Sequence, residues 1–222
     1  MKNNTIQQIE DYVKNVGGYE AAHDFNHVDR VRNWALHIAK KEGFQDLIVV
    51  EASALLHDIG LPSAERRMHG EIGSQTARKF LKENNLFSEE KINEICNAIK
   101  YHNKNREGKG MLLNILRDAD MMDLFGAMGI MRVCIFASAR LPYDYINPKG
   151  ETWGMTARDF DLRFDKGIGT GNCIVDVINF GISCYDNLST QTARQLAMPY
   201  VEFMRNFVEQ LSSEVSKNRQ KA

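Results

Sequence analysis

An apolar run from Leu47 to Leu56 ends directly in the pair His57-Asp58, and the helix-breaking sequence Gly-Leu-Pro follows after Ile59. A segment that is apolar on almost every side predicts a buried central helix, here over about 45 to 57. An acidic side chain at the end of such a helix is costly to bury unless a cation or strong donors compensate it. Imidazole nitrogen and carboxylate oxygen side by side suit divalent metals. The sequence therefore predicts a metal centre where this helix ends.

Four further candidate ligands give the order His, His-Asp, His, His, Asp along the chain. They are His27 in HDFNHVDRV, His69 in RMHGEIGS, His102 in AIKYHNK and Asp120 in RDADMMDLFGA. Helical spacing after Leu116 predicts that Asp120 faces inward, and the same spacing after Ile99 applies to His102. Two residues keep a second interpretation, because His102 also fits a satisfied core histidine and His69 fits local hydrogen bonding at a helix start.

The periodicity predicts helix nearly everywhere, and hence an all-α fold. One amphipathic segment precedes Gly17 and another ends at Gly43. Further helices are expected over about 70 to 83 and 88 to 102, with long apolar stripes over 112 to 139, 173 to 188 and 192 to 213. The four prolines are expected outside helix interiors or near helix ends.

Composition excludes several classes of function. The 222 residues carry 26% charged side chains and a formal net charge of −1, so no overall basic field attracts a nucleic acid duplex or an anionic membrane. The four dispersed cysteines lack CxxC spacing and are expected to be buried thiols, although their even number leaves disulfides open. The polar start of the chain and the shortness of its apolar runs predict a cytoplasmic protein without a membrane span.

The ordered ligands resemble those of the HD-domain metal-dependent phosphohydrolase superfamily. Similar motifs are HDxxH ending at His27, LLHDIG, DADMMDLFGAMGIMR and NLSTQTARQLAMPYVEFMRNFVEQ; the last is similar to a small, mostly uncharacterised bacterial branch. The resemblance spans nearly the whole chain and is weakest at about 140 to 170. It implies a compact, single-domain HD helical fold over 1–222, with a metal-site core at about 20–140 and a helical completion at about 155–215.

The resemblance also assigns ligands. It implies a minimal site of His27, His57, Asp58 and Asp120, and it relates His69 to a histidine that binds a second metal in HD-GYP phosphodiesterases. If His69 and His102 both bind, the site holds two ions with Asp58 as the natural bridge. If neither does, one ion sits on four ligands. The ions would be Mn, Fe, Co, Zn or Mg, since this donor set accepts several.

Three departures limit the likeness to HD-GYP proteins. Leu61 replaces the lysine after HDIG, His102-Asn103 replaces the start of HHE, and no GYP motif follows. A cyclic-dinucleotide phosphodiesterase is therefore not expected. Met121 also stands where the related branch often has arginine, which removes one cation for binding a phosphate or carboxylate.

The expected activity is hydrolysis of a phosphate ester or phosphoanhydride, with a small phosphorylated substrate that is most plausibly a nucleotide. Asp58, Asp123 and His23 are the candidates for catalytic work, since Asp123 lies one helical turn after Asp120 and His23 one turn before His27. An exposed loop position is an equal alternative for His23. The candidate phosphate-binding residues lie next to His69 and His102 in the sequence. They are Arg66, Arg67, Lys100 and Lys104.

Two other functions stay open at this point. The same ligand order is found in HD-type diiron oxygenases similar to myo-inositol oxygenase, and a non-catalytic regulatory module that binds metal or nucleotide is the other alternative. An apolar stripe near the C-terminus also leaves a homodimer possible.

Overall fold

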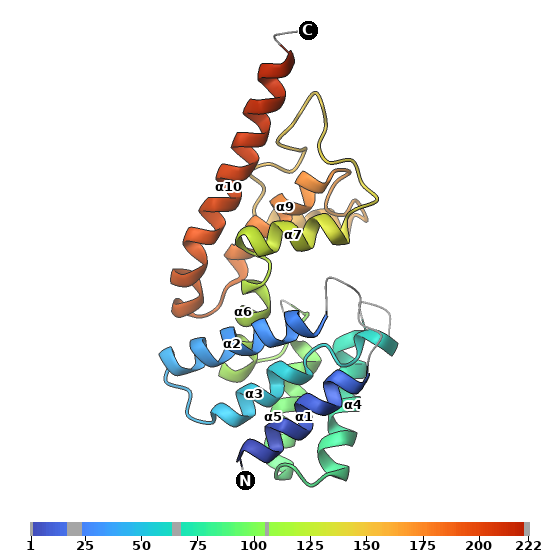
Figure 1. Ribbon diagram of the computed structural model, residues 1–222, viewed down its shortest axis with the longest axis vertical. Coiled ribbons are helices and arrows are strands. Elements are labelled where there is room, and N and C mark those ends of the chain that lie inside the picture. Colours follow the sequence, from blue (N-terminus) through green and yellow to red (C-terminus); the bar gives the residue numbers. More distant parts are fainter. Residues whose placement is uncertain (1, 17–23, 64–67, 105–106, 220–222) are drawn as a thin grey trace. The chain divides into compact units, whose positions relative to one another are not determined.

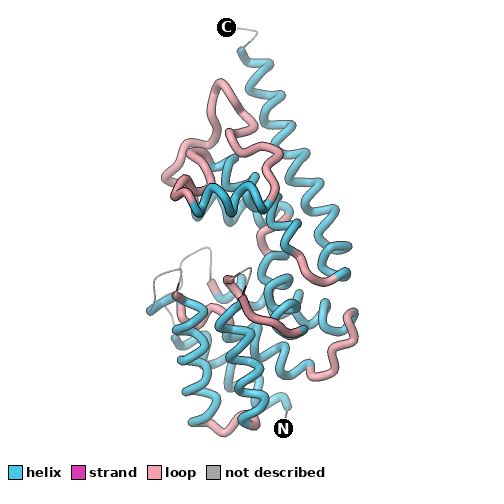
Figure 2. Tube along the Cα trace, turned by 180° about the vertical axis from the view of Figure 1, so that it is seen from behind, coloured by secondary structure: helices cyan, strands magenta, loops and turns pink. Residues whose placement is uncertain are grey.

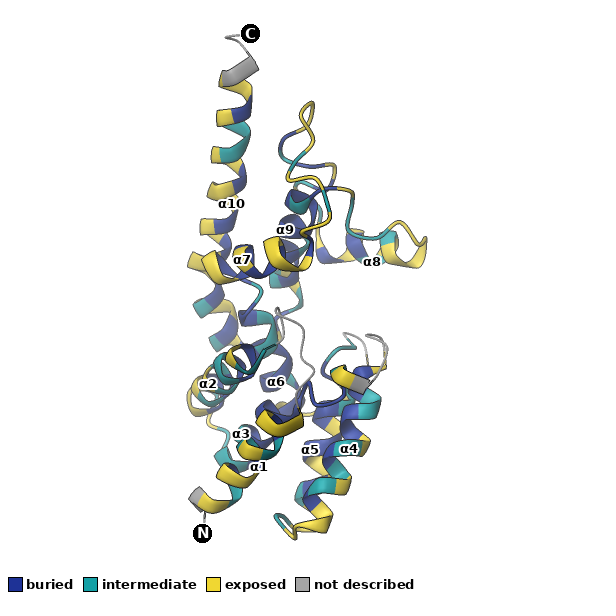
Figure 3. Cartoon of the chain, turned by 45° about the vertical axis from the view of Figure 1, so that its right-hand side comes forward, coloured by how far each residue is buried: buried dark blue, intermediate teal, exposed yellow. Residues whose placement is uncertain are grey.

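The computed structural model describes residues 2–16, 24–63, 68–104 and 107–219, and these residues form helices joined by loops (Figure 2). Within these ranges no β-strand forms, and one isolated β-bridge joins Leu141 and Cys173. The predicted all-α fold is confirmed. The helices, labelled in Figure 1 except for α8, which Figure 3 labels, are α1 (Lys2–Val16), α2 (Phe25–Lys41), α3 (Leu47–Leu56), α4 (His69–Glu83), α5 (Glu89–Tyr101), α6 (Met111–Met122), α7 (Gly126–Phe136), α8 (Ala157–Asp165), α9 (Ile174–Ser183) and α10 (Gln191–Arg219), with short 3₁₀ helices at Leu61–Ser63 and Cys184–Asn187.

The chain divides into two compact units. Unit 1 contains the chain up to Met122, with α1 to α6, together with Ser189–Ala193. Unit 2 contains Asp123–Leu188 and the chain from Arg194 onward. All six candidate metal ligands belong to unit 1. That the whole chain acts as one HD-type domain stays a prediction.

Helix α3 is the central helix of unit 1. It contacts α1, α2, α5 and α6, and seven of its ten residues are buried, including Leu55 and Leu56 (Figure 3). A helix surrounded by others has no polar face to keep, which explains why its sequence is apolar almost all round. This arrangement confirms the predicted buried helix and places His57 and Asp58 inside the unit.

The turn after α3 passes very close to the start of α4. A Cβ atom built on Gly60 would lie 2.2 Å from the carbonyl oxygen of His69 and 2.5 Å from the backbone nitrogen of Gly73. Atoms of side chains are not tolerated at such distances from backbone. Glycine at position 60 therefore lets the backbone that carries His57 and Asp58 meet the backbone that carries His69.

The apolar stripe expected over 112–139 is divided between two helices and does not form one continuous helix. Helix α6 ends at Met122 and α7 begins at Gly126, whose φ of 70° is a left-handed conformation that is found at a helix end but not in a helix interior. Pro199 also contradicts the sequence-based expectation, because it lies inside α10. The proline ring fixes φ near the helical value, so this long helix loses a hydrogen bond without ending there.

Unit 2 contains a long connection between α7 and α8 that is fastened by one buried carboxylate. Asp176, 1% exposed, accepts hydrogen bonds from the backbone nitrogen and the hydroxyl of Thr152 and from the backbone nitrogen of Cys173. Gly150 and Gly171 pack against the same side chain, with positive φ values. Helix α8 follows this connection, in the stretch where the sequence was least informative.

The cysteines are all free, and the expectation that they are buried holds for Cys96, Cys173 and Cys184. It is wrong for Cys134, which is exposed because it lies on an outward face of α7. None of the described helices is both long and apolar enough to cross a membrane.

We predict that Gly60→Ala destabilises the protein by about 1 to 3 kcal/mol, the usual cost of overpacking, because the new methyl group would collide with the backbone of α4. Urea unfolding measures the change. Gly181→Ala, in α9, is the control: its Cβ would lie at ordinary contact distances, 3.4 Å from Met204 Cε and 3.5 Å from the carbonyl oxygen of Leu124, so it should be neutral or stabilising. Equal stability of the two variants would contradict the close approach at Gly60.

Candidate metal centre

The candidate ligands come from five elements of unit 1. His27 lies in the first turn of α2, where the carboxylate of Asp24 caps the helix by accepting a hydrogen bond from the His27 backbone nitrogen at 3.0 Å. His57 and Asp58 follow α3, His69 is the first residue of α4, His102 follows α5, and Asp120 lies near the end of α6. Helix ends thus supply most of the ligands.

One oxygen of Asp58 faces the first set of ligands. Its Oδ2 lies 3.3 Å from His57 Nε2 and 3.5 Å from His27 Nε2, while these two nitrogens are 3.3 Å apart. Asp120 closes the same group, with Oδ1 at 3.5 Å from His27 Nε2 and 4.0 Å from His57 Nε2.

The other oxygen of Asp58 faces the second set. Its Oδ1 lies 3.3 Å from His69 Nε2 and 3.5 Å from His102 Nε2, and these two nitrogens are 3.0 Å apart. The carboxylate of Asp58 is therefore shared between two groups of donors, one on each oxygen. All six sequence-predicted ligands are brought into a single cluster.

Two rings are held so that Nε2 points into the cluster. The Nδ1 of His57 donates to the carbonyl oxygen of Ala54 at 2.7 Å, and the Nδ1 of His102 donates to that of Ile99 at 2.6 Å. A neutral imidazole that donates from Nδ1 keeps a lone pair on Nε2. The α3 and α5 backbones thus prepare Nε2 of both rings for a metal.

The donor set fits divalent cations. Nitrogen and oxygen ligands lie ~2.1 Å from a zinc-like ion, which places neighbouring ligands about 3.0 to 3.4 Å apart in octahedral or tetrahedral geometry. Four of the eight distances above fall in this range, three are 3.5 Å, and the distance between Asp120 Oδ1 and His57 Nε2 is 4.0 Å. The side chains of His27, His57 and Asp58 are buried with 0%, 0% and 5% exposure. The Asp120 side chain, 34% exposed, is the open side of the cluster.

The cluster also stabilises charge inside the fold. Burial opposes protonation of His57, but the carboxylates of Asp58 and Asp120 outweigh it and raise the pKa of His57 to about 9. Burial likewise opposes ionisation of Asp58, yet the neighbouring His57 charge and hydrogen bonds from the histidines hold the pKa of Asp58 well below its usual value. The pKa of Asp120 is lowered too, against the effect of burial, mainly by His57 and His27.

The other predicted site residues divide into two groups. His23, Arg66 and Arg67 lie outside the described residues. Lys100 pairs with Glu71 at 3.0 Å, and Lys104 lies 3.6 Å from Glu107, so both predicted phosphate-binding lysines have nearby carboxylates that compete for their charge. A role for these residues in binding phosphate stays a prediction.

The three aspartates of DADMMD have three different sets of contacts. Asp120 joins the cluster, while Asp123 belongs to unit 2, where its carboxylate pairs with Arg132 Nη1 at 3.0 Å. Its catalytic role stays a prediction. Sequence reasoning missed Asp118, which is fully buried and accepts hydrogen bonds from the backbone nitrogens of Ser189 and Thr190 at 2.8 and 2.7 Å.

Arg117 was missed as well. Its guanidinium donates to the backbone carbonyl oxygens of Tyr101, Lys104 and Glu107, and so anchors the chain that leaves α5 beside His102. Burial lowers the pKa of this guanidinium, which nonetheless stays charged. The available signal was an arginine placed one residue after Leu116 in an inward-facing stretch of α6.

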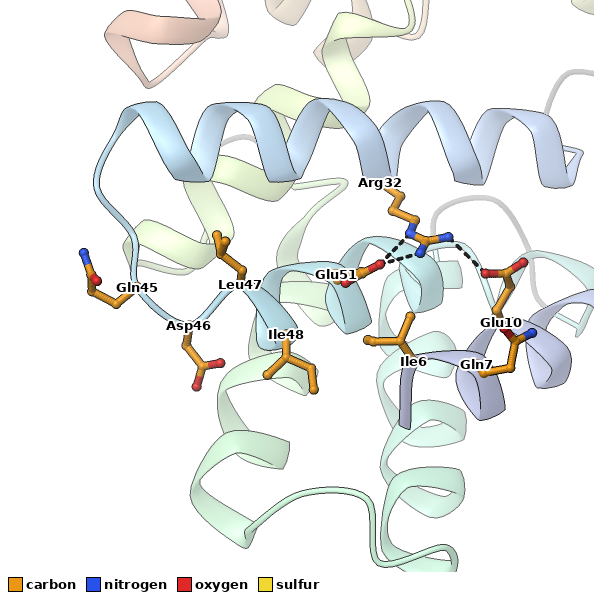
Figure 4. Close-up of a pocket in the computed structure, with 9 residues that line it drawn as sticks. All are labelled: Ile6, Gln7, Glu10, Arg32, Gln45, Asp46, Leu47, Ile48 and Glu51. Atoms are coloured by element: carbon orange, nitrogen blue, oxygen red, sulfur yellow. Dashed lines mark hydrogen bonds and ion pairs between the residues drawn. The ribbon is translucent and has the colours of Figure 1, made fainter. Parts of the chain in front are cut away.

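A separate cavity of about 480 Å³ lies among α1, α2 and the start of α3, as Figure 4 shows. Arg32 enters it but is already paired, through Nη1 with Glu10 at 3.0 Å and through Nε with Glu51 at 2.8 Å. None of the clustered histidines lines this cavity. The histidine and aspartate cluster is therefore the candidate functional site, separate from this cavity.

Comparison with known families agrees with this assignment. Residues 24–128 match the model of the HD domain family, and this segment includes every clustered ligand. This part of the chain is therefore similar to the HD domain family, as its motifs indicated.

Relatives extend over nearly the whole chain. The uncharacterised protein YpgQ of Bacillus subtilis is 28% identical over 216 residues, covering 94% of this chain and 93% of YpgQ. An HD-superfamily hydrolase from Bacillus thuringiensis is similar in structure, with a TM-score of 0.67, 25% identity and coverage of 96% and 98% of the two chains. A structure of YpgQ in complex with ADP has a TM-score of 0.64 at 23% identity and covers 96% of each chain.

The raised pKa of His57 predicts how the metal-free fold responds to pH. Because the folded-state pKa is about 9 and the ordinary value is 6.5, charged His57 stabilises the fold fully below pH 6.5, and this contribution is lost as pH rises through 9. Urea unfolding in the presence of a chelator should therefore give a falling free energy of unfolding between pH 6.5 and 9. His57→Asn should flatten this dependence. A wild-type stability that is constant or rises over that interval would contradict the charge assignment.

Proposed function

We propose that this protein is a metal-dependent phosphohydrolase that uses two divalent ions to hydrolyse a phosphate ester or phosphoanhydride of a nucleotide. The observation that carries the proposal is the placement of Asp58, whose two oxygens face two separate groups of imidazoles at 3.3 to 3.5 Å. His27, His57, Asp58 and Asp120 would hold one ion, and Asp58, His69 and His102 would hold the second. Two such ions would supply the charge stabilisation that an in-line phosphoryl displacement needs.

The charge balance of the cluster favours a phosphate substrate. The whole chain carries a formal net charge of −1, so attraction for phosphate must be local. Two divalent ions would bring four positive charges against the two carboxylates of Asp58 and Asp120, while the histidines are neutral as ligands. The loaded site is therefore cationic, although the predicted lysines nearby have carboxylate partners.

The residues of the cluster divide the work between them. When bound, the two ions supply Lewis acidity, lowering the pKa of a water nucleophile and neutralising charge on the phosphoryl group. Asp58 sets the spacing of the two sites, and buried His27 and His57 exclude water from the inner side. Asp120, with its side chain 34% exposed, holds the side on which a substrate enters. Proton transfer by His23 or Asp123 remains part of the proposal.

A nucleotide is the proposed substrate class because YpgQ, a relative over nearly the full chain, was crystallised with ADP. The donors are imidazole and carboxylate throughout, which suits Mn²⁺, Fe²⁺, Co²⁺ or Zn²⁺ better than soft ions and also admits Mg²⁺. Metal content of protein purified without added metal identifies the ion.

Removing single ligands should reveal the two-ion arrangement. We predict that Asp58→Asn loses both ions, because both groups depend on this carboxylate, whereas His102→Ala reduces bound metal from two ions per chain towards one. His37→Ala is the matched control, since His37 is exposed on α2. Metal per chain is measured by elemental analysis after dialysis. Full metal content in Asp58→Asn would contradict the bridging role.

Hydrolytic activity should depend on bound metal. We predict release of phosphate or pyrophosphate from nucleotides that is stimulated by Mn²⁺ or Co²⁺ and abolished by chelators. Asp58→Asn should reduce this activity more than about 100-fold, because even residues that only hydrogen-bond to metal ligands change the activity of such sites 10- to 100-fold. The His37→Ala variant should keep wild-type activity. No turnover of nucleotides or phosphomonoesters with any divalent ion, together with substrate-dependent oxygen uptake by the iron-loaded protein, would favour the oxygenase instead.

A further inference from the structure

Asn103, the residue after His102, contacts the cluster through the ring of His69, on the side away from Asp58. Its side-chain nitrogen Nδ2 lies 3.2 Å from His69 Nδ1. Its oxygen Oδ1 is buried and accepts no hydrogen bond from the residues that the structure describes. A buried carbonyl oxygen without a hydrogen-bond donor destabilises the fold, so a half turn of the Asn103 amide, which moves this oxygen, is favoured.

The surroundings of Asn103 favour the opposite orientation of its amide. A Cβ atom built on Gly70 would lie 2.8 Å from Asn103 Oδ1, 2.8 Å from the carbonyl oxygen of Lys100 and 3.1 Å from that of Ile99. Three oxygens therefore lie within about 3.1 Å of one point, so Asn103 Oδ1 faces a region lined by two backbone carbonyl oxygens. Carbonyl oxygens can accept a hydrogen bond from an amide NH₂ but cannot donate one to an amide oxygen. A half turn of the amide exchanges the two atoms and places Oδ1 on His69 Nδ1.

The orientation decides what His69 presents to the cluster. A neutral imidazole carries one N–H and one lone pair. If Asn103 Nδ2 donates to Nδ1, the proton of the ring is on Nε2, which lies 3.3 Å from Asp58 Oδ1 and then forms a hydrogen bond instead of binding a metal. If Asn103 Oδ1 accepts from Nδ1, the lone pair is on Nε2 and is available to a cation.

We propose that Asn103 is a positioning residue for the second ion: its side-chain oxygen accepts the Nδ1–H of His69 and so keeps Nε2 of His69 as a ligand. The backbone carbonyls of Ala54 and Ile99 do the same for His57 and His102. The inference rests on the proposed two-ion site and is independent of the reaction that the site performs. It also gives a role to the asparagine that stands where HD-GYP proteins have a second histidine.

Variants at position 103 test the proposal through metal binding. Asn103→Ala should weaken binding of the second Mn²⁺ by about 10- to 100-fold, as loss of a group behind a ligand does, with the first ion unaffected. Asn103→Asp should restore binding, because its carboxylate accepts the same N–H. Asn93→Ala, on the exposed side of α5, is the control. Titration calorimetry gives both affinities, and Asn103→Ala with two wild-type affinities would overturn the proposal.

A measurement on the wild-type protein does not depend on how the variants fold. Long-range ¹H–¹⁵N spectra of the metal-free protein identify the tautomer of His69, for which we expect Nδ1–H and an unprotonated Nε2. Protonated Nε2 with unprotonated Nδ1 would overturn the role of Asn103. Failure of nucleotide hydrolysis would leave this result standing, so the two proposals fail separately.

Discussion

The buried carboxylate of Asp58 is the constraint on which the rest of unit 1 depends. An ionised group inside a protein is tolerated only when cations or donors surround it. Here four imidazoles from four helices do so, two on each oxygen, and the pKa of Asp58 stays low despite burial. Removing any one of these helices from its place would expose the charge to an apolar interior, so the ligands and the packing of the helices stabilise each other.

Close backbone packing makes this arrangement possible. Gly60 and Gly70 lie where the end of α3, the start of α4 and the end of α5 meet, and neither position has room for a side chain. The motifs HDIG and HGEIG thus combine ligands with the glycines that let the ligand-bearing segments approach. Arg117 adds to this by fixing the carbonyl groups that follow α5, close to His102. The chemistry of the site depends on these contacts as much as on the donors themselves.

The short acidic motif at the end of α6 shows how neighbouring residues acquire different contacts. Asp118 caps the chain at Ser189 and Thr190, Asp120 faces the histidines, and Asp123 pairs with Arg132 in unit 2. Successive residues of a helix point about 100° apart, so identical side chains meet different surroundings. The proposed role of Asn103 follows the same logic, because its contact with His69 depends on the path of the chain after α5 and on no pattern in the sequence.

The all-α fold, the buried helix before His57 and the six residues of the cluster were predictable from the sequence, with a second interpretation left open for His69 and His102. Apolar periodicity and the order of metal-binding side chains can be read along the chain. The sequence did not predict features that depend on contacts between residues far apart in the chain. These are the break before Gly126, the helix that continues through Pro199, the exposure of Cys134, and the partners of Asp118 and Arg117. Only the tertiary structure assigned each oxygen of Asp58 to its own pair of histidines. That assignment depends on the distances between helices, which residue spacing along one chain does not encode.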